Sequence, residues 1–199
     1  MITDTLIKMF AMLAIVGVVF IVAVIVLALI ARFRGGAPEW LIPLRDGFSD
    51  LALPLAFCVA LVCTLGSLYL SEVKHLPPCD MCWYQRICMY PSALILGIAA
   101  FRRDVGIRWY IIPLATVGVG LSTYHRLIEL FPDSVASSCT NDVPCSTVWV
   151  KEFGFLTIPT MAGIGFLLII TLLLLARPRV SAPDHESPDS EPRDQEVMA

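Results

Sequence analysis

Charged residues are scarce in this sequence: only 16% of its 199 residues are Asp, Glu, Lys or Arg, whereas 57% are hydrophobic. Soluble domains carry roughly a quarter charged residues, so the composition excludes an ordinary soluble domain and indicates an integral membrane protein. The net charge of −3 comes from residues 177–199, which contain three arginines and six acidic residues. No basic run lies elsewhere, and we therefore expect no nucleic-acid partner.

The sequence also lacks a secretory cleavage site directly after its first apolar stretch, residues 9–31. The segment "ARFRGG" follows, without a small-x-small pattern. The apolar run is also longer than the roughly 7–15 residues of a signal-peptide core. We interpret residues 9–31 as a retained transmembrane helix, and a cleaved signal peptide is the alternative.

Long apolar runs are abundant. About 20 apolar residues at roughly 1.5 Å each cross a hydrocarbon core about 30 Å thick, and residues 51–70 and 155–176 meet this length without a charge. Residues 83–101 contain one charge, Arg86, and residues 109–130 are uncharged only up to Tyr124. We expect both to span the membrane, and each of these two predictions depends on the other. The sequence therefore predicts an all-α integral membrane protein with five transmembrane helices.

Basic residues in the loops predict the orientation of these helices. Eight arginines lie at one set of helix ends, namely Arg32, Arg34, Arg45, Arg102, Arg103, Arg108, Arg177 and Arg179. Only three lysines lie at the other set, namely Lys8, Lys74 and Lys151. Because cytoplasmic loops are enriched in Lys and Arg, we expect the N-terminus outside and the C-terminus in the cytoplasm.

This orientation places both loop cysteine pairs outside the cytoplasm, where disulfides persist. The pairs are Cys79 with Cys82 and Cys139 with Cys145. The other three cysteines lie within the apolar stretches and are expected to be small buried apolar side chains; they are Cys58, Cys63 and Cys88.

The two outer pairs are compatible with three kinds of site. Together they offer four thiolates to a structural zinc ion, although the C-x5-C spacing is longer than is usual for zinc. A structural disulfide suits Cys139 and Cys145, which enclose a short loop. The C-x-x-C of Cys79 and Cys82 is instead typical of a reactive redox pair.

The position of the C-x-x-C favours the redox interpretation. Pro77 and Pro78 disfavour a helix before Cys79, so we expect the next helix to begin between Asp80 and Trp83. At a helix N-terminus, unpaired backbone N–H groups and the positive end of the dipole favour thiolate.

Two further polar residues lie near the outer ends of apolar helices. Arg86 follows Cys82 by four residues and therefore shares its helix face, one turn deeper. An ionisable group at that depth is costly and usually functional; an interfacial arginine that extends to the headgroups is the alternative. His125 and Glu129 are four residues apart on one face, and this cluster is either functional or merely interfacial.

These motifs resemble the disulfide bond formation protein B (DsbB) family, with its BdbC-type relatives. The resemblance covers roughly residues 49–176, and the string C-x-x-C-W-Y-Q-R at the start of a transmembrane helix is specific. It rests on "PCDMCWYQRICMYP", "YHRLIELFP", "SCTNDVPCS" and "FGFLTIPTM". The order of these elements along the chain agrees with the family.

The resemblance implies a division of the chain into three regions. Residues 49–176 form a DsbB-like four-helix transmembrane bundle, with helices at about residues 51–70, 83–101, 109–130 and 155–176. Residues 1–48 hold an extra N-terminal transmembrane helix and a cytoplasmic linker. Residues 177–199 form an acidic tail whose composition predicts disorder.

The family's activity implies a protein-dithiol:quinone oxidoreductase in the inner membrane of a bacterium. Its members re-oxidise a soluble, DsbA-like thioredoxin-fold oxidase and pass the electrons to a membrane quinone, which is ubiquinone or menaquinone. Such an enzyme supports disulfide formation and folding in exported proteins. Its other partner is the membrane lipid with its quinone pool, and no metal is implied.

The resemblance also assigns roles around the quinone. Cys79 and Cys82 match the quinone-proximal pair, which forms one disulfide, and Cys82 matches the sulfur that meets the quinone. Arg86 matches the arginine that contacts the quinone head, and His125 matches a family histidine near that site.

Cys139 and Cys145 match the disulfide that exchanges with the soluble partner, with Cys139 as the site of the mixed disulfide. Their short spacing departs from the longer loops of the family. We expect it to leave the loop less freedom to move between the partner and the C-x-x-C.

Two alternative functions come from different classes. A vitamin K epoxide reductase-like enzyme also combines a four-helix bundle, a C-x-x-C and a quinone, but its loop pair precedes a C-x-x-C at the last core helix. Here the C-x-x-C comes first. A zinc-binding or structural membrane protein without enzymatic activity is the other alternative.

Overall fold

A computed structural model describes residues 2–34, 41–132, 139 and 143–176. Within them, five long helices follow one another: α1 (Ile2–Phe33), α2 (Leu41–Leu68), α3 (Asp80–Arg102), α4 (Arg108–Leu130) and α5 (Ile158–Leu175). Shorter elements connect them: η1 (Tyr69–Val73), η2 (Val105–Ile107), β1 (Lys151–Glu152) and β2 (Leu156–Thr157). The acidic tail expected at residues 177–199 and residues 35–40 of the linker lie outside the described residues.

Most of these helices are suited to a membrane by length and composition. Four helical segments of the described chain qualify: Thr5–Phe33, Gly47–Val73, Val105–Leu130 and Ile158–Leu175. The helix α3 has 23 residues but a lower mean hydropathy, because its first turns carry the polar residues of the C-x-x-C string. The prediction of an all-α integral membrane protein is confirmed, and α3, which is also expected to span the membrane, packs against α2 and α4.

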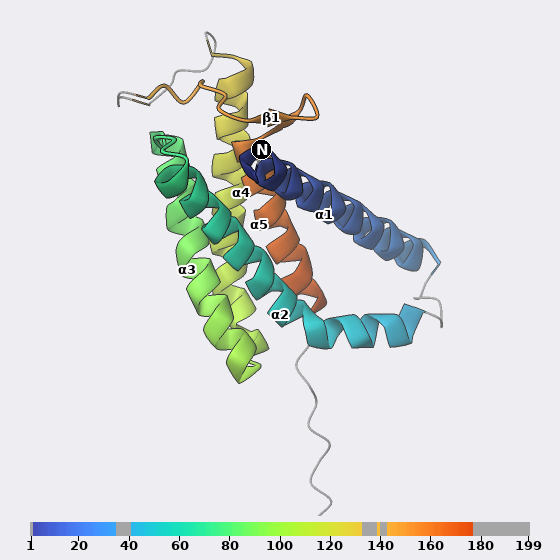
Figure 1. Ribbon diagram of the computed structural model, residues 1–199. Coiled ribbons are helices and arrows are strands. Elements are labelled where there is room, and N and C mark those ends of the chain that lie inside the picture. The colour runs from blue at the N-terminus through green and yellow to red at the C-terminus, as the bar shows by residue number, and fades with distance from the viewer. Residues whose placement is uncertain (1, 35–40, 133–138, 140–142, 177–199) are drawn as a thin grey trace, which may run out of the picture.

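Helices α2, α3, α4 and α5 form a four-helix bundle (Figure 1). In cyclic order, α2 packs on α3, α3 on α4, α4 on α5 and α5 on α2. The core between them is apolar, and its largest fully buried side chain is Phe166 of α5. Gly118 of α4 allows this ring to approach, because a Cβ at that position would lie only 2.5 Å from ring atoms of Phe166.

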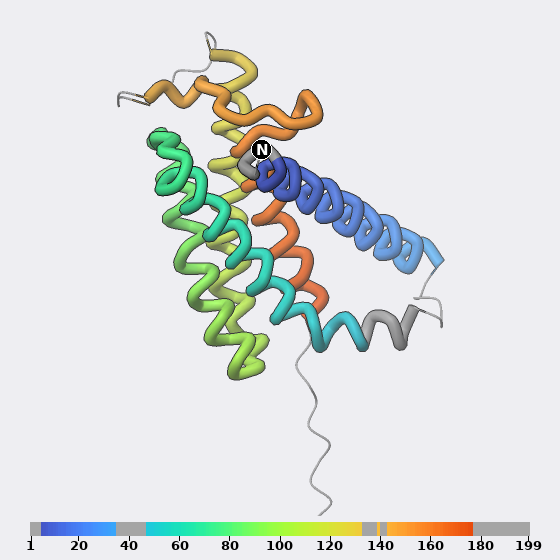
Figure 2. The backbone as a smooth tube through the Cα atoms, viewed as in Figure 1, coloured from blue at the N-terminus to red at the C-terminus, as the bar shows by residue number. Residues whose placement is uncertain are grey.

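The helix α1 lies outside this bundle and packs mainly on α5. Its buried positions are the small residues Ala11, Ala14 and Gly17, spaced three apart on one face. Small side chains let two membrane helices approach closely. Figures 1 and 2 show α1 in contact with the bundle near its N-terminal end and diverging from α5 toward its C-terminal end.

One end of the bundle, here called the cysteine end, is built from the start of α3, the end of α4 and the β1–β2 hairpin (Figure 1). The hairpin pairs Lys151 with Thr157 and Glu152 with Leu156. Its turn contains Gly154 at φ 81°, a left-handed conformation that glycine adopts without steric cost. Strands of two residues carry no alternating pattern, so the sequence did not predict this hairpin.

Candidate redox site

The cysteines of the C-x-x-C lie where the two prolines predict a helix start. Cys79 is the N-cap of α3, in extended backbone with φ −74° and ψ 171°, and its carbonyl accepts a 3.1 Å hydrogen bond from the Trp83 N–H. Cys82 therefore falls in the first turn. The helix begins at Asp80, three residues before the apolar segment that we expected from Trp83.

The two sulfurs of the C-x-x-C lie 3.0 Å apart as a pair of free thiols. The disulfide that the resemblance implies for this pair remains a prediction, and the short distance between the sulfurs is compatible with it. Cys79 is buried, with 5% of its surface exposed, and Cys82 is half-buried. A fixed, close and shielded pair is suited to forming and breaking one S–S bond.

Cys139 and Cys145, by contrast, are joined in a disulfide, with their Cα atoms 6.1 Å apart. Cys145 is buried, with 1% of its surface exposed, whereas Cys139 is half-buried. Both belong to one apolar cluster with Cys79 and Cys82, packed on Ile128 of α4. We expected the short loop to restrict movement between the pairs, but little movement is needed because the loop disulfide already packs against the C-x-x-C.

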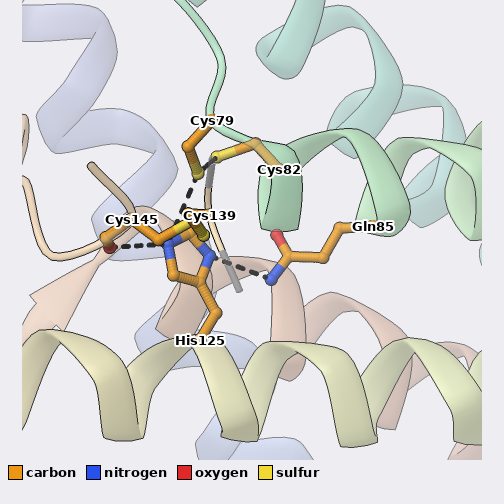
Figure 3. The surroundings of a disulfide bond; sticks show 6 residues. All are labelled: Cys79, Cys82, Gln85, His125, Cys139 and Cys145. Carbon is orange, nitrogen blue, oxygen red and sulfur yellow. Dashed lines mark hydrogen bonds between the residues drawn. A yellow bond between two sulfur atoms is a disulfide. The ribbon is translucent and has the colours of Figure 1, made fainter. Parts of the chain in front are cut away.

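His125 connects the two cysteine pairs (Figure 3). It projects from α4 and is buried, with 3% of its surface exposed. Its Nε2 atom lies 3.6 Å from Cys79 Sγ and 3.2 Å from the Cys145 carbonyl oxygen. Its Nδ1 atom lies 3.5 Å from the Gln85 amide nitrogen, which is a donor, so Nδ1 accepts and the ring proton is on Nε2. His125 therefore directs an N–H toward Cys79 and Cys145.

This arrangement favours a thiolate at Cys79, which lies just before the α3 span. Hydrogen bonding with Cys82 is the largest cause that lowers the pKa of Cys79, and His125 adds to it. Burial opposes both, and the result is a pKa lowered from 9.0 to about 4. A low pKa makes Cys79 a good leaving thiolate in thiol–disulfide exchange.

The contribution of His125 is testable by pH-dependent alkylation. A hydrogen bond to a charged group is worth about 1.5–3 kcal/mol, and one pKa unit is about 1.4 kcal/mol. Because the thiolate is the form present above the pKa, His125→Ala should move the onset of Cys79 labelling by iodoacetamide about one to two pH units upward. Tandem mass spectrometry of the peptide that ends at Arg86 distinguishes the label on Cys79 from that on Cys82.

His75 provides the matched control, because it is exposed and lies outside the cluster. His75→Ala should leave the labelling profile unchanged. An unchanged profile in His125→Ala as well would show that the histidine does not stabilise the thiolate.

Arg86 lies one helical turn after Cys82 along α3, and its side chain is held by hydrogen bonds to α2. Its Nε donates to Ser67 Oγ at 3.0 Å, and Nη2 donates to the Ser67 carbonyl at 3.2 Å. Tyr90 donates to the same hydroxyl at 3.3 Å, and the guanidinium lies over the Trp83 ring at 5.2 Å. Among the described residues, no carboxylate lies within ion-pair distance of Arg86, so its charge is available to a ligand.

A cavity of about 570 Å³ opens beside this arginine. Its polar side chains gather at the cysteine end and include Cys82, Gln85, Arg86 and Ser67; its remaining wall is largely apolar. Cavities of about 300–1,000 Å³ with a few polar groups are typical of small-molecule sites. Cys79 is not among the lining residues, so the two sulfurs of the C-x-x-C face different surroundings.

Several side chains lie where the sequence did not place them. Glu129 does not join His125: it accepts hydrogen bonds from Arg126 at 2.7 Å and Thr157 at 2.8 Å, and so fastens the hairpin to α4. Cys88 is buried as expected, but Cys58 is exposed and Cys63 is half-buried, because both border the cavity.

Two residues of the site were missed by the sequence analysis. Gln85 is buried and orients His125, and its place between Cys82 and Arg86 in the motif was the available signal. Ser67 anchors Arg86 from 19 residues away, on another helix, and no local pattern marks it.

A cation site is also conceivable from the ligand atoms present. The sulfurs of Cys79 and Cys82 and a ring nitrogen of His125 lie within 4.8 Å of one another. A site of four thiolates, as considered above, is not formed here, because the other two cysteines are in a disulfide. Metal analysis of the reduced protein would measure whether these three groups retain zinc.

Comparison with known proteins points to one family. The family model described as disulfide bond formation protein DsbB matches residues 49–176. Disulfide bond formation protein C of Bacillus subtilis is 46% identical over 123 residues, which cover 61% of this chain and 89% of that protein. A probable disulfide formation protein of Deinococcus radiodurans is 45% identical over 145 residues, covering 68% and 94%.

A third relative, a probable disulfide formation protein of Coxiella burnetii, is 42% identical over 129 residues, which cover 64% of this chain and 88% of that protein. No solved structure matches the chain. The region matched by the family model contains both cysteine pairs, Arg86 and His125, and it begins after α1.

Proposed function

Because the chain belongs to the DsbB family of disulfide bond formation proteins, and is thus a disulfide oxidoreductase of the bacterial membrane, we propose that it links a soluble dithiol protein to a membrane quinone. The observation that carries this proposal is that the two cysteines of the C-x-x-C lie in different surroundings. Cys82 borders the cavity together with Arg86, whereas Cys79 lies beside His125 and Cys145. One sulfur faces an acceptor site and the other faces the loop disulfide.

The cavity fits a quinone in chemistry and size. Arg86 and the Gln85 amide offer hydrogen-bond donors at its polar end, and the apolar remainder suits a prenyl tail. A bound quinone accepts two electrons and two protons, which are those lost when two thiols form one S–S bond. The fixed charge of Arg86 stabilises negative charge on an oxygen held there.

Thiol exchange delivers the electrons to the C-x-x-C. A thiolate of the soluble partner attacks Cys139, the more accessible sulfur of the loop disulfide, and releases the Cys145 thiolate. Cys145 attacks Cys79 within the Cys79–Cys82 disulfide and releases Cys82 as a thiolate. The partner's second thiolate then displaces Cys139, and the partner leaves oxidised.

Cys139 finally attacks Cys145, which restores the loop disulfide and leaves Cys79 and Cys82 as a dithiol. In the structure, Cys139 and Cys145 are joined in a disulfide, and the sulfurs of Cys79 and Cys82 lie 3.0 Å apart. The Nε2–H of His125 faces the Cys79 sulfur and the Cys145 carbonyl oxygen, and it favours the thiolate that leaves at Cys79.

The proposed partner is a soluble thioredoxin-like oxidase, and the cysteine end faces the compartment where it resides. The arginines at the opposite helix ends support this orientation: Arg102 and Arg103 follow α3, and Arg108 begins α4. The N-terminal end of α1 then lies outside the cytoplasm, beside the hairpin.

The relay can be tested by removing only the loop disulfide. In a Cys139→Ser/Cys145→Ser variant, oxidation of a reduced thioredoxin-like protein should fall by at least about 100-fold, because the disulfide with which this protein exchanges is absent. Reduction of ubiquinone by dithiothreitol, which reaches the C-x-x-C directly, should stay within about threefold of wild type. Both rates are read optically under anaerobic conditions.

The two rates together keep the test decisive. A variant that oxidises the protein substrate at the wild-type rate would remove the loop disulfide from the path. Loss of both rates, with the helical circular dichroism intact, would contradict the proposal that the C-x-x-C reduces quinone without the loop disulfide.

A further inference from the structure

The apolar cavity extends far beyond the residues that contact a quinone head. From Ser67 to Leu55 it follows α2 over twelve residues, which is about 18 Å of helix. Leu168 and Leu172 of α5 border the same space. Within the described chain, the polar lining side chains are confined to its cysteine end, so the inner part offers only apolar contacts.

The helix α1 forms a wall of this inner part, although it lies outside the region matched by the family model. Ile7, Phe10, Leu13 and Phe20 of α1 line the cavity along about 20 Å. Without this helix, the groove between α2 and α5 would face lipid directly.

The packing of α1 places the Phe10 ring next to the polar end of the cavity, where the quinone head is proposed to bind. Gly17 sits on α5, where a Cβ would lie 3.3 Å from Leu168 Cδ2, and Ala11 and Ala14 are buried beside Leu156 of the hairpin. The close packing of α1 on α5 brings the Phe10 ring against α2, where a Cβ on Gly66 would lie 3.1 Å from the ring. Gly66 precedes Ser67, the anchor of Arg86.

We propose that α1 encloses the prenyl tail of the quinone and selects quinones by their tails, with Phe10 and Gly66 forming the constriction between head and tail. This inference rests on the proposed function, since it takes the head at Arg86 as its starting point. We favour a quinone over a phospholipid acyl chain because the donors at the polar end, Arg86 and the Gln85 amide, line the same cavity as the apolar wall. α1 is thus part of the ligand site, not only an additional membrane anchor.

Photolabelling of the full-length protein tests this placement without an activity measurement. A ubiquinone analogue with a diazirine at the end of a long prenyl tail should label peptides of α1, α2 and α5 that line the cavity. Excess unlabelled long-tail ubiquinone should suppress the label, whereas excess phospholipid should not. Label confined to helix faces turned to lipid, or suppressed equally by phospholipid, would overturn the proposal.

Tail selectivity provides the second measurement. In Phe10→Ala, the KM for long-tail ubiquinone should rise about tenfold, while the KM for a ubiquinone analogue that lacks the isoprene tail changes less than about twofold. Val19→Ala is the matched control, because Val19 is 63% exposed on α1 and does not line the cavity. Equal effects of Phe10→Ala on both quinones would contradict a role for α1 in tail binding.

These outcomes are separable from failure of the proposed function. If wild-type protein reduces no quinone of either tail length, the proposed function itself is wrong. If it reduces both, and the tail label is absent from α1, only the role of α1 is wrong.

Discussion

Cys82→Ser is expected to reduce quinone reduction by dithiols by about three orders of magnitude or more, as removal of a reacting nucleophile does. Cys82 is the sulfur of the C-x-x-C that borders the cavity, and serine cannot form the S–S bond that releases two electrons. The rate is measured as loss of ubiquinone absorbance after dithiothreitol is added anaerobically. Exchange of the partner with the loop disulfide should continue, and mass spectrometry of trapped mixed disulfides detects it.

Cys88→Ser is the matched control for this prediction. Cys88 is a buried cysteine of the same helix, six residues further on, and it packs in the bundle core away from the redox cluster. Its replacement should leave the quinone rate within about threefold of wild type. Quinone reduction by Cys82→Ser at a rate close to that of Cys88→Ser would rule out Cys82 as the donor.

Arg86→Met is expected to lower kcat/KM for quinone by about 100- to 1,000-fold, the usual effect of removing a donor to a developing oxyanion. The thiols should remain competent, because neither Cys79 nor Cys82 is hydrogen-bonded to Arg86 in the structure. Single-turnover transfer from the partner to the C-x-x-C, followed by alkylation and mass spectrometry without quinone, should therefore proceed at the wild-type rate.

Two further variants sharpen this result. Ser67→Ala removes the hydroxyl that holds the guanidinium but keeps the charge, so its effect should be smaller, about tenfold. Arg102→Met, at the exposed opposite end of α3, should have no effect on the quinone rate. If Arg86→Met slowed thiol transfer as much as quinone reduction, the arginine would be a structural residue and not a quinone contact.

Local sequence patterns predicted much of the helical framework. Uninterrupted apolar runs predicted where α1, α2 and α5 lie, because the thickness of the bilayer fixes their length. Pro77 and Pro78 predicted the start of α3, since neither residue supports a helix that continues through it. The charge of Arg86 within an apolar segment also predicts that it belongs to a functional site, and this remains a prediction.

What the sequence could not predict depends on contacts between distant segments. Whether His125 faces the cysteines or the lipid depends on how α4 is rotated against α3, and spacing along one helix does not fix that rotation. The same holds for Glu129, which bonds Thr157 across 28 residues instead of joining the histidine. The short hairpin and the position of α1 on α5 likewise depend on contacts between segments that are far apart in the sequence.

The division between the two sulfurs of the C-x-x-C is also a three-dimensional property. In the sequence, Cys79 and Cys82 are an ordinary C-x-x-C pair. In the structure, their sulfurs lie only 3.0 Å apart, yet Cys79 lies beside His125 whereas Cys82 borders the cavity. In the proposed relay, this difference lets one pair exchange disulfides on one side and lose electrons on the other.

A stoichiometric anaerobic measurement tests most directly whether the C-x-x-C couples oxidation of the partner to reduction of quinone. Reduced thioredoxin-like protein is mixed with the wild-type membrane protein and ubiquinone, and new disulfide and quinol are counted in the same sample. Electron transfer through Cys79 and Cys82 predicts one quinol for each partner disulfide, and neither product in Cys82→Ser. Partner disulfide formed without quinol, or quinol formed by Cys82→Ser, would contradict it.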